Sequence, residues 1–420
     1  MENAALDIAT VSKVRRYMGV SFQNFILIIL SIYFFANALV DTFPSEVAAY
    51  PIRLAVYLLF FVTVVSLYGI QIRKFLLGLG IVLVYTLIHY YYFSRTGEFQ
   101  YIYLFYVKNF ISMVGSFLSS YLLIYAFVIY FKNNSIEFIS KIAIVYVIFY
   151  LFHLIYMVLT KQLYDSDDGR YSALSVEPSH FGLILGCLFC ILGQRLTWLR
   201  LGAQTIIFIL FFGFVRAKFA IIILPVAFVF YFLNRTFIKP GNFFVILILI
   251  LMVFVQSFVT LIFNYNDFGG LVTFVTRFSF WYMGVEHLIT HPLGDGGAIL
   301  STLYDNLYTF ISDAKRAGLN TYELEIYLTD PDSFKPKDTF STWLIYFGLP
   351  GLTVFLYYTR KWLNMAIGRG LWLWSLVCFF IASELVYINL TASGCSFQLL
   401  VLGYIIVQLK TSKNEKNIYR

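Results

Sequence analysis

Charged side chains are scarce in this chain: they make up 12% of its 420 residues, whereas hydrophobic residues make up 60%. Soluble domains carry roughly twice that share of charge because they must face water, so the scarcity argues against a soluble protein. A chain solvated by lipid has to pair its backbone polar groups internally, which leaves only helices or a closed barrel. The apolar runs lack the alternation of barrel strands and therefore predict helices.

Sequence motifs for common cofactors and metals are also missing. The sequence has no Walker phosphate loop, no dinucleotide fingerprint and no cluster of metal ligands, which disfavours an ATP-driven pump or a flavoenzyme. The four cysteines are Cys187, Cys190, Cys378 and Cys395, and all of them fall within apolar runs. The spacing of Cys187 and Cys190 therefore indicates buried small side chains and not a redox or metal site. We expect neither a cofactor nor a metal.

The apolar runs predict about twelve transmembrane helices in a single integral membrane domain, residues 1–420. They cover residues 20–40, 52–70, 75–93, 102–131, 138–160, 181–193, 203–213, 219–233, 243–263, 341–358, 371–390 and 395–409. The expected fold class is an all-α polytopic membrane protein. Residues 36–38 imitate a signal-peptidase site, but the first run is long enough to span a membrane, so we expect it to stay uncleaved.

Positive charges mark the cytoplasmic side of a membrane protein. With the N-terminus inside, the inner loops hold most Lys and Arg residues, and an even number of spans returns the basic tail, residues 410–420, to the cytoplasm. One long hydrophilic stretch, residues 264–340, then forms an outer loop between spans 9 and 10. Because this loop has a net charge of −5 and the whole chain +8, the rest carries +13. The basic balance reflects topology, and nucleic acid is not an expected partner.

Polar breaks on the outer side are candidate sites, and the first is the outer loop of residues 161–180. This loop holds Arg170, and Glu177-Pro178 stands where the next helix should begin. Pro178 favours a helix start, and Glu177 would face the positive N-terminus of that helix. The loop is either an ordinary solvated connection or a carboxylate and an arginine held at the membrane surface for a polar substrate.

The second break places Arg216 and Lys218 inside the apolar stretch 203–233. Two cations there would be costly if they faced lipid, so we expect a tight turn between two short helices, with both charges near the outer surface. Ionisable residues at membrane depth are functional by default. The pattern therefore favours a substrate-binding site over a purely structural turn.

The third and fourth breaks bound the long loop. An apolar stripe at steps of three and four predicts an amphipathic membrane-surface helix over residues 274–289. The stripe consists of Phe274, Phe278, Trp281, Val285 and Leu288. Arg277 lies beside it, either as a binding residue or as an ordinary interfacial arginine, and His291 and Asp295 lie in the Gly-rich turn that follows. At the far end Asp338 precedes the returning helix, in which Gly348-Leu349-Pro350-Gly351 predicts close packing or a kink.

In this order, the pieces resemble the bacterial O-antigen polymerase and O-antigen ligase superfamily of membrane glycosyltransferases (Wzy-like and WaaL-like). The matching pieces are Arg170 with Glu177-Pro178, Val215-Arg216-Ala217, Arg277 with Trp281 before His291-Pro292-Leu293-Gly294, and Gly348-Leu349-Pro350-Gly351-Leu352. They cover nearly half of the chain, and each is degenerate alone. Ligases of the superfamily carry a His-Asn pair where Lys337-Asp338 stands here, which favours a polymerase.

The resemblance implies polymerisation of undecaprenyl-pyrophosphate-linked oligosaccharide repeat units into O-antigen or a similar surface polysaccharide, at the periplasmic face of the inner membrane. Donor and acceptor would both be lipid-linked glycans, with no nucleotide sugar and no metal. The residues expected to bind substrate are Arg170, Arg216, Arg277, Lys218 and His291. A carboxylate would activate the acceptor hydroxyl as general base, and the candidates are Glu177, Asp338 and Asp295.

Two other functions fit parts of the pattern. An O-antigen ligase would transfer glycan to lipid A-core. A lipid-linked oligosaccharide flippase or other transporter is disfavoured, since transporters usually show internal repeats and the first six spans do not recur in the last six. The lipid bilayer is an expected partner, and a chain-length regulator and a flippase would act beside a polymerase. The loop tyrosines are either sugar-stacking surfaces or loop core, and they include Tyr304, Tyr308, Tyr322 and Tyr327.

Overall fold

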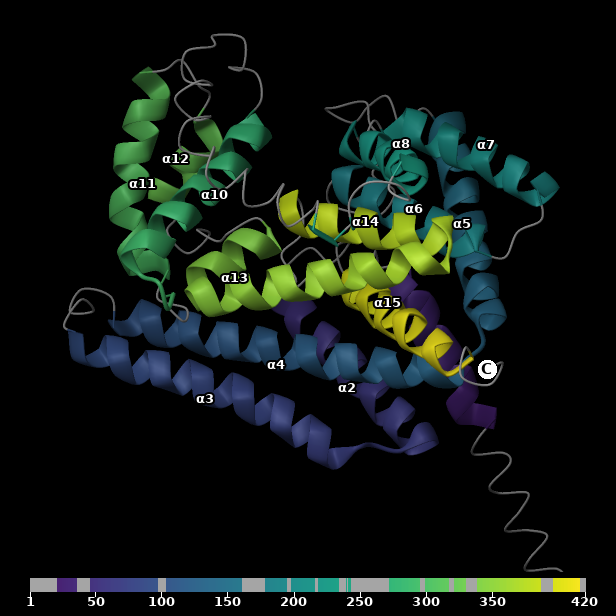
Figure 1. The fold of residues 1–420 in the computed structure, drawn as a ribbon, viewed down its shortest axis with the longest axis horizontal. Helices are drawn as coiled ribbons and strands as arrows, with labels where there is room; N and C mark the ends of the chain where they lie inside the picture. Colours follow the sequence, from purple (N-terminus) through teal and green to yellow (C-terminus); the bar gives the residue numbers. More distant parts are fainter. Residues whose placement is uncertain are drawn as a thin grey trace, which may run out of the picture. The chain divides into compact units, whose positions relative to one another are not determined.

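Helices form every regular element in the part of the chain that the computed structural model describes, which confirms the predicted all-α class (Figure 1). The described residues are 21–35, 46–96, 103–160, 178–194, 198–215, 218–233, 239, 241–242, 272–294, 299–316, 321–329, 338–386 and 396–415. After a first helix at Ser21–Phe35 come α2 (Glu46–Tyr68), α3 (Ile72–Thr96), α4 (Tyr103–Asn133), α5 (Ile136–Leu159), α6 (Pro178–Gly193), α7 (Trp198–Val215) and α8 (Lys218–Leu233). The later helices are α10 (Val272–Thr290), α11 (Ile299–Arg316), α12 (Tyr322–Thr329), α13 (Thr339–Ala366), the 3-10 turn η3 (Ile367–Arg369), α14 (Leu371–Val386) and α15 (Ser396–Glu415).

Several of these helices are suited to a membrane. Among the described residues, three stretches are long and apolar enough to cross one, namely Val114–Asn133, Ile136–Leu159 and Thr339–Arg369. Shorter apolar helices lie at Ser21–Phe35, Ile52–Tyr68, Phe181–Gly193, Ile223–Phe232, Leu371–Leu385 and Ser396–Lys410. The predicted span 243–263 lies outside the described residues. These helices support a membrane protein, whereas the count of twelve and the orientation stay predictions.

The helix α5 shows how a lipid-facing helix arises from its sequence. The Ser135 side chain caps it by accepting a hydrogen bond from the Phe138 amide (3.2 Å), and Glu137 pairs with Lys141 (3.3 Å) one turn later. Its buried residues include Ile139, Ala143, Tyr146, Tyr150 and Leu154, and its exposed ones include Ile144, Ile148, Phe152, Ile155 and Leu159. A helix that is apolar on both its buried and its exposed sides is stable in lipid and not in water.

The chain divides into two compact units. Unit 1 comprises Met1–Leu76, Ser119–Ile221 and Ser396–Arg420, and unit 2 comprises Leu77–Leu118 and Ile222–Cys395. The helices α3 and α4 therefore contribute to both units. Most of the described pieces that resemble the glycosyltransferases, from α10 to α13, belong to unit 2.

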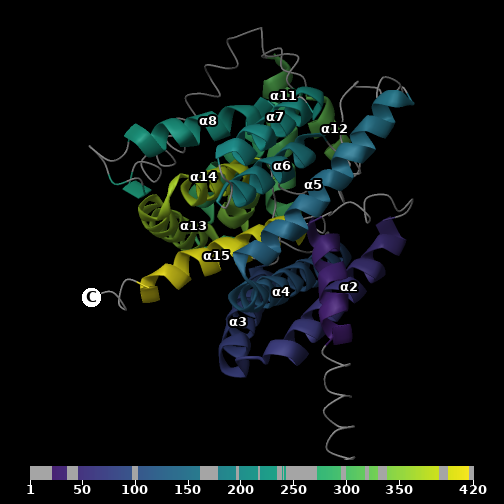
Figure 2. The same cartoon turned by 90° about the vertical axis from the view of Figure 1, so that its right-hand side faces the viewer.

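Aromatic side chains form the core of unit 1. The buried rings of Phe34, Phe60 and Phe127 lie with centroids 4.8, 4.9 and 5.0 Å apart in the three pairs, and such pairs add about 0.5–1.5 kcal/mol each beyond the burial of their area. Gly403 of α15 packs directly on Phe127 of α4, so these two helices lie side by side (Figure 2). Cys187 and Cys190 of α6 are buried, as predicted.

Unit 2 is built around the antiparallel pair α13 and α14, which η3 connects (Figure 1). The indole N–H of Trp374 in α14 donates to the Ala227 carbonyl of α8 (2.9 Å). The Gly241 amide donates to the Asn364 side chain of α13 (3.1 Å). These bonds satisfy polar groups inside an apolar environment, where an unpaired group would cost several kcal/mol.

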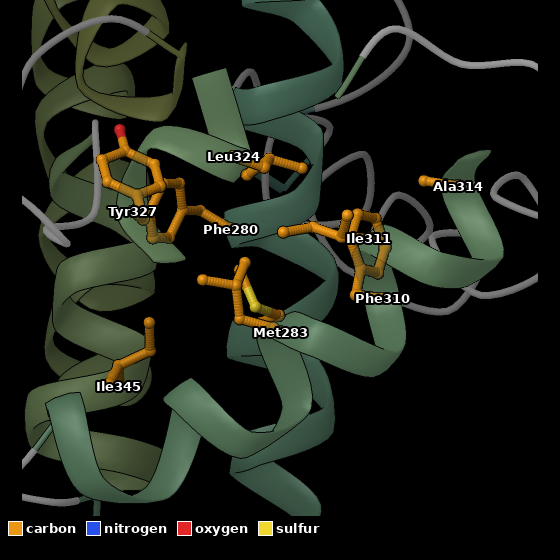
Figure 3. Packing of buried hydrophobic residues seen from close by; sticks show 9 residues of the cluster. Phe280, Met283, Phe310, Ile311, Ala314, Leu324, Tyr327 and Ile345 are labelled. Atoms are coloured by element: carbon orange, nitrogen blue, oxygen red, sulfur yellow. The ribbon is translucent and has the colours of Figure 1, made fainter. Parts of the chain in front are cut away.

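The long polar stretch has a small hydrophobic core of its own, formed where α10, α11 and α12 meet α13 (Figure 3). Its buried members are Phe280, Met283, Leu307, Phe310, Ile311, Ala314, Leu324, Tyr327 and Ile345. At its edge the Thr321 hydroxyl donates to Glu325 (2.5 Å) and Lys315 pairs with the same carboxylate (3.1 Å). The hydrogen bond from Thr321 and then Lys315 lower the pKa of Glu325. The described part of the loop is thus a folded helical structure on α13.

The burial of α10 differs from the predicted single stripe. Trp281 is buried, but Val285 and Leu288 are only partly covered. The buried positions include Thr276, Ser279, Phe280, Met283 and His287. The reason is that α10 packs against α11 and α12 as well as against α13, so protein covers more than one of its faces. A pattern search for one apolar face could not anticipate that environment.

The structure decides between the two roles of the loop tyrosines where it describes them. Tyr327 is 4% exposed and belongs to the loop core, so it is not a sugar-binding surface. Tyr308 and Tyr322 are 70% and 67% exposed, so they lie outside that core. The side chain of Tyr304 lies outside the described part.

Candidate functional site

Two of the sequence pieces that carry the resemblance contact each other in unit 2. The turn of His291-Pro292-Leu293-Gly294 ends α10, and Gly348 kinks α13 with φ 55° and ψ −139°. At this kink the Leu349 amide donates to the Pro292 carbonyl (2.8 Å) in place of a partner within its own helix. The predicted kink and the predicted close packing at the Gly-Leu-Pro-Gly sequence are both confirmed.

Glycine is required on both sides of this contact. Gly294 and Gly348 have positive φ values of 75° and 55°, a region that other residues rarely adopt. A Cβ on Gly294 would lie 2.6 Å from the Gly348 amide nitrogen, and one on Gly348 would lie 2.5 Å from the Gly294 nitrogen. Because both obstacles are backbone atoms, neither could move aside without separating the turn from the helix.

Tyr85 of α3 secures the junction from a third helix. Its hydroxyl lies 3.0 Å from the Leu293 carbonyl and 3.3 Å from the Phe347 carbonyl, and donates toward both. Its ring lies 5.1 Å from the ring of Phe347. The kink withdraws backbone groups of α13 from the regular helical pattern, and the hydroxyl replaces part of what is lost.

His291, one of the predicted binding residues, lies beside this junction. Its ring stacks on that of His287 with centroids 4.5 Å apart, and its Nδ1 is 3.0 Å from the Thr290 hydroxyl. It is partly exposed. The end of α10 therefore presents an imidazole next to the Gly-rich turn, at a helix C-terminus that favours positive charge.

Asp338, one of the three predicted general bases, caps α13. Its carboxylate accepts hydrogen bonds from the Ser341 amide (2.7 Å) and from the Ser341 hydroxyl (2.9 Å), and it is fully buried. Its carbonyl accepts from the Thr342 hydroxyl (2.7 Å). Such a cap stabilises a helix by about 1 kcal/mol. Asp338 thus has a structural task as the N-cap of α13, as the polar residues before this helix indicated.

A second buried carboxylate lies beside this cap. Glu384 is near the end of α14 and only 3% exposed. Its Oε2 accepts a hydrogen bond from the hydroxyl of Thr339, the residue that follows Asp338, at 2.5 Å. Within the described residues its Oε1 has no hydrogen-bond partner. Helix α14 is otherwise nearly all apolar, so this carboxylate is the exception in its helix.

Trp281 links α10 to both of these helices. Its indole N–H donates to the Leu385 carbonyl in α14 (2.9 Å), and its ring lies 4.6 Å from that of Phe340 in α13. Gly284 then faces Leu344, one turn further along both helices. The two helices therefore run parallel. Because position 277 precedes Trp281 by one helical turn, the backbone of Arg277 belongs at the end of α13 that carries Asp338.

The structure thus sorts the predicted residues into two ends of the α10–α13 pair. Arg277, by its backbone position, and Asp338 share one end, and His291 lies at the other. Along α10 these ends are fourteen residues apart, from Arg277 to His291, which is roughly 20 Å. The two groups therefore cannot touch one small chemical group together.

Most of the other predicted residues lie outside the described part of the chain: Arg170, Glu177, Arg216 and Asp295, together with the side chains of Lys218 and Arg277. The helix boundaries beside them agree with prediction. Helix α6 begins at Pro178, and α7 ends at Val215 before α8 begins at Lys218. The predicted turn at 216–217 between them lies outside the described residues and stays a prediction.

Sequence reasoning missed Glu384 and Tyr85. Glu384 did carry a signal, since it is a lone carboxylate in the predicted span 371–390, and ionisable residues at membrane depth are functional by default. Tyr85 carried no such signal, because nothing in the sequence distinguishes it from the other tyrosines among the 33 in the chain. Only its contact with the Leu293 carbonyl shows its role. Comparison of the chain with family models, curated proteins and solved structures finds no match.

Proposed function

We propose that this protein polymerises undecaprenyl-pyrophosphate-linked oligosaccharide repeat units into O-antigen or a similar surface polysaccharide. It is a membrane glycosyltransferase that works at the periplasmic face of the inner membrane. The observation that supports this most is the contact between the His291–Gly294 turn and the Gly348 kink. Two pieces that resemble the superfamily, far apart in sequence, form one interlocked junction.

The reaction transfers a growing glycan from one lipid carrier to the sugar hydroxyl of another. The acceptor oxygen attacks the anomeric carbon of the donor, and the bond from that carbon to the pyrophosphate oxygen breaks. Arginines would hold the leaving pyrophosphate, since guanidinium groups pair with phosphate oxygens in a two-pronged geometry. Arg170, Arg216 and Arg277 are the candidates. Exposed Tyr308 and Tyr322 would stack on sugars.

Deleting the gene tests the proposal directly. We expect lipid A-core that carries at most one repeat unit, because ligation continues when polymerisation stops. Electrophoresis of the lipopolysaccharide should show the ladder collapse to the lowest band, and expression from a plasmid should restore it. A core without any repeat unit would indicate a ligase or a flippase instead. An unchanged ladder would contradict all three functions.

The proposed orientation has a separate test. Single cysteines at Ser312 and Thr329, in a background without native cysteine, should react with an impermeant maleimide added to intact spheroplasts. Cysteines at Asn364 and Ser412 should react only after the membrane is disrupted. The opposite pattern would place the long loop in the cytoplasm and end the argument for substrates at the outer face.

A further inference from the structure

Glu384 is the buried carboxylate that the proposed site leaves without a task. Among the described residues, Glu384 and Asp338 are the buried acidic side chains where α10, α13 and α14 meet, and Glu384 is 3% exposed. A carboxylate at membrane depth is costly, so stability alone does not explain its presence.

The hydrogen bonds separate the two carboxylates. Both oxygens of Asp338 accept bonds from Ser341, which ties this group to the capping of α13. Glu384 uses only Oε2, which accepts from the Thr339 hydroxyl at 2.5 Å. Its Oε1 keeps its lone pairs unused among the described residues. Of the two groups, Glu384 is the one with a carboxylate oxygen that no described hydrogen-bond donor occupies.

The surroundings hold this oxygen in place. Thr339 is the first residue of α13, so the positive end of that helix faces Glu384 and favours a negative charge there. Leu385, the next residue, accepts the Trp281 indole hydrogen bond (2.9 Å), which fixes the end of α14 against α10. The same helix α10 carries Arg277 one turn before Trp281. The Glu384 carboxylate and the backbone of Arg277, a predicted pyrophosphate-binding residue, thus lie at the same end of the group formed by α10, α13 and α14.

We propose that Glu384, and not Asp338, is the group that accepts the proton of the acceptor hydroxyl during glycan transfer. This inference rests on the proposed polymerase function. In the step, the hydroxyl oxygen bonds to the anomeric carbon of the donor, the bond to the pyrophosphate oxygen breaks, and its electron pair leaves with the pyrophosphate. The hydroxyl proton moves to Oε1 of Glu384. Thr339 positions the carboxylate through Oε2.

Glu384→Gln is the decisive variant because it keeps the shape and the hydrogen bond from Thr339 but removes the base. In the deletion strain it should form polymer at least about 100-fold more slowly than wild type, as expected when a general base is lost, with normal protein in the membrane. Glu384→Asp, which keeps a carboxylate, should recover part of the rate. The readout is the appearance of the lipopolysaccharide ladder after induction, with protein measured by immunoblot.

Two comparison variants separate a chemical role from a structural one. Glu286→Gln makes the same change on an exposed face of α10 and should leave the ladder unchanged. Asp338→Ser keeps a capping side chain but removes the other carboxylate, and it should slow polymerisation less than Glu384→Gln does. A larger loss in Asp338→Ser would overturn the inference, and so would a loss in Glu384→Gln that merely follows lower protein abundance.

The outcome for Glu384 is distinguishable from the outcome for the proposed function. If deletion removes the ladder and Glu384→Gln restores it fully, the protein is a polymerase and Glu384 is not its base. If deletion leaves the ladder intact, the polymerase function itself is wrong. Loss of the ladder both in the deletion strain and in Glu384→Gln, with normal levels of the variant protein, supports the polymerase function and the role of Glu384 as its base.

Discussion

Replacing Arg216 or Arg277 with alanine is expected to abolish long glycan chains while the protein stays at normal levels in the membrane. If each arginine holds the pyrophosphate, its loss removes charge stabilisation that typically contributes about 10²–10³-fold in rate. Arg→Lys should rescue only partly, because an ammonium keeps the charge but loses the two-pronged geometry. The ladder in a complemented deletion strain, with expression matched by immunoblot, measures the effect.

The competing role for these arginines is simple anchoring at the membrane surface. On that view lysine would substitute fully, and alanine would lower abundance more than activity. Arg73→Ala, at an exposed arginine in the first turn of α3 on the predicted cytoplasmic side, is the matched control and should leave the ladder unchanged. Lys218→Ala should have a smaller effect than Arg216→Ala. A ladder of normal length in Arg277→Ala would remove Arg277 from the site.

Gly348→Ala is expected to prevent stable folding of unit 2. Alanine at the observed φ of 55° and ψ of −139° costs about 1–3 kcal/mol, and forcing a methyl group into close packing adds about 1–3 kcal/mol. The new Cβ would lie 2.5 Å from the Gly294 nitrogen and 2.7 Å from the Leu293 carbonyl carbon, so the turn would have to leave the kink and lose its hydrogen bond from Leu349. Heating the detergent-solubilised protein and following it by size-exclusion chromatography measures the loss.

Two further variants test the cause of that effect. Gly294→Ala should be similarly damaging, since its φ is 75° and its Cβ would lie 2.6 Å from the backbone of Tyr346 and Gly348. Gly80→Ala in α3 is the control: nothing lies within 4 Å of its Cβ position, and alanine is favoured in a helix by about 1 kcal/mol. Wild-type thermal stability in Gly348→Ala would show that the close contact does not hold unit 2 together.

The helical class and several helix boundaries followed from the sequence because local signals determine them. Apolar composition indicated helices suited to lipid, and Pro178 marked the start of α6. Each signal acts over a few residues. The Gly-Leu-Pro-Gly sequence likewise predicted a kink, since proline lacks the amide hydrogen that a continuous helix needs.

Only the tertiary structure decided which residues gather at one place. The turn at Gly294 fits the kink at Gly348, and Tyr85 reaches both, although these positions are distant in sequence. The role of Glu384 is visible only in the tertiary structure, where the Thr339 hydroxyl donates to it, because the surrounding donors determine how a carboxylate reacts. Local pattern sets where helices begin and end, while the chemistry of a site depends on which faces of distant helices pack together, and that depends on the whole fold.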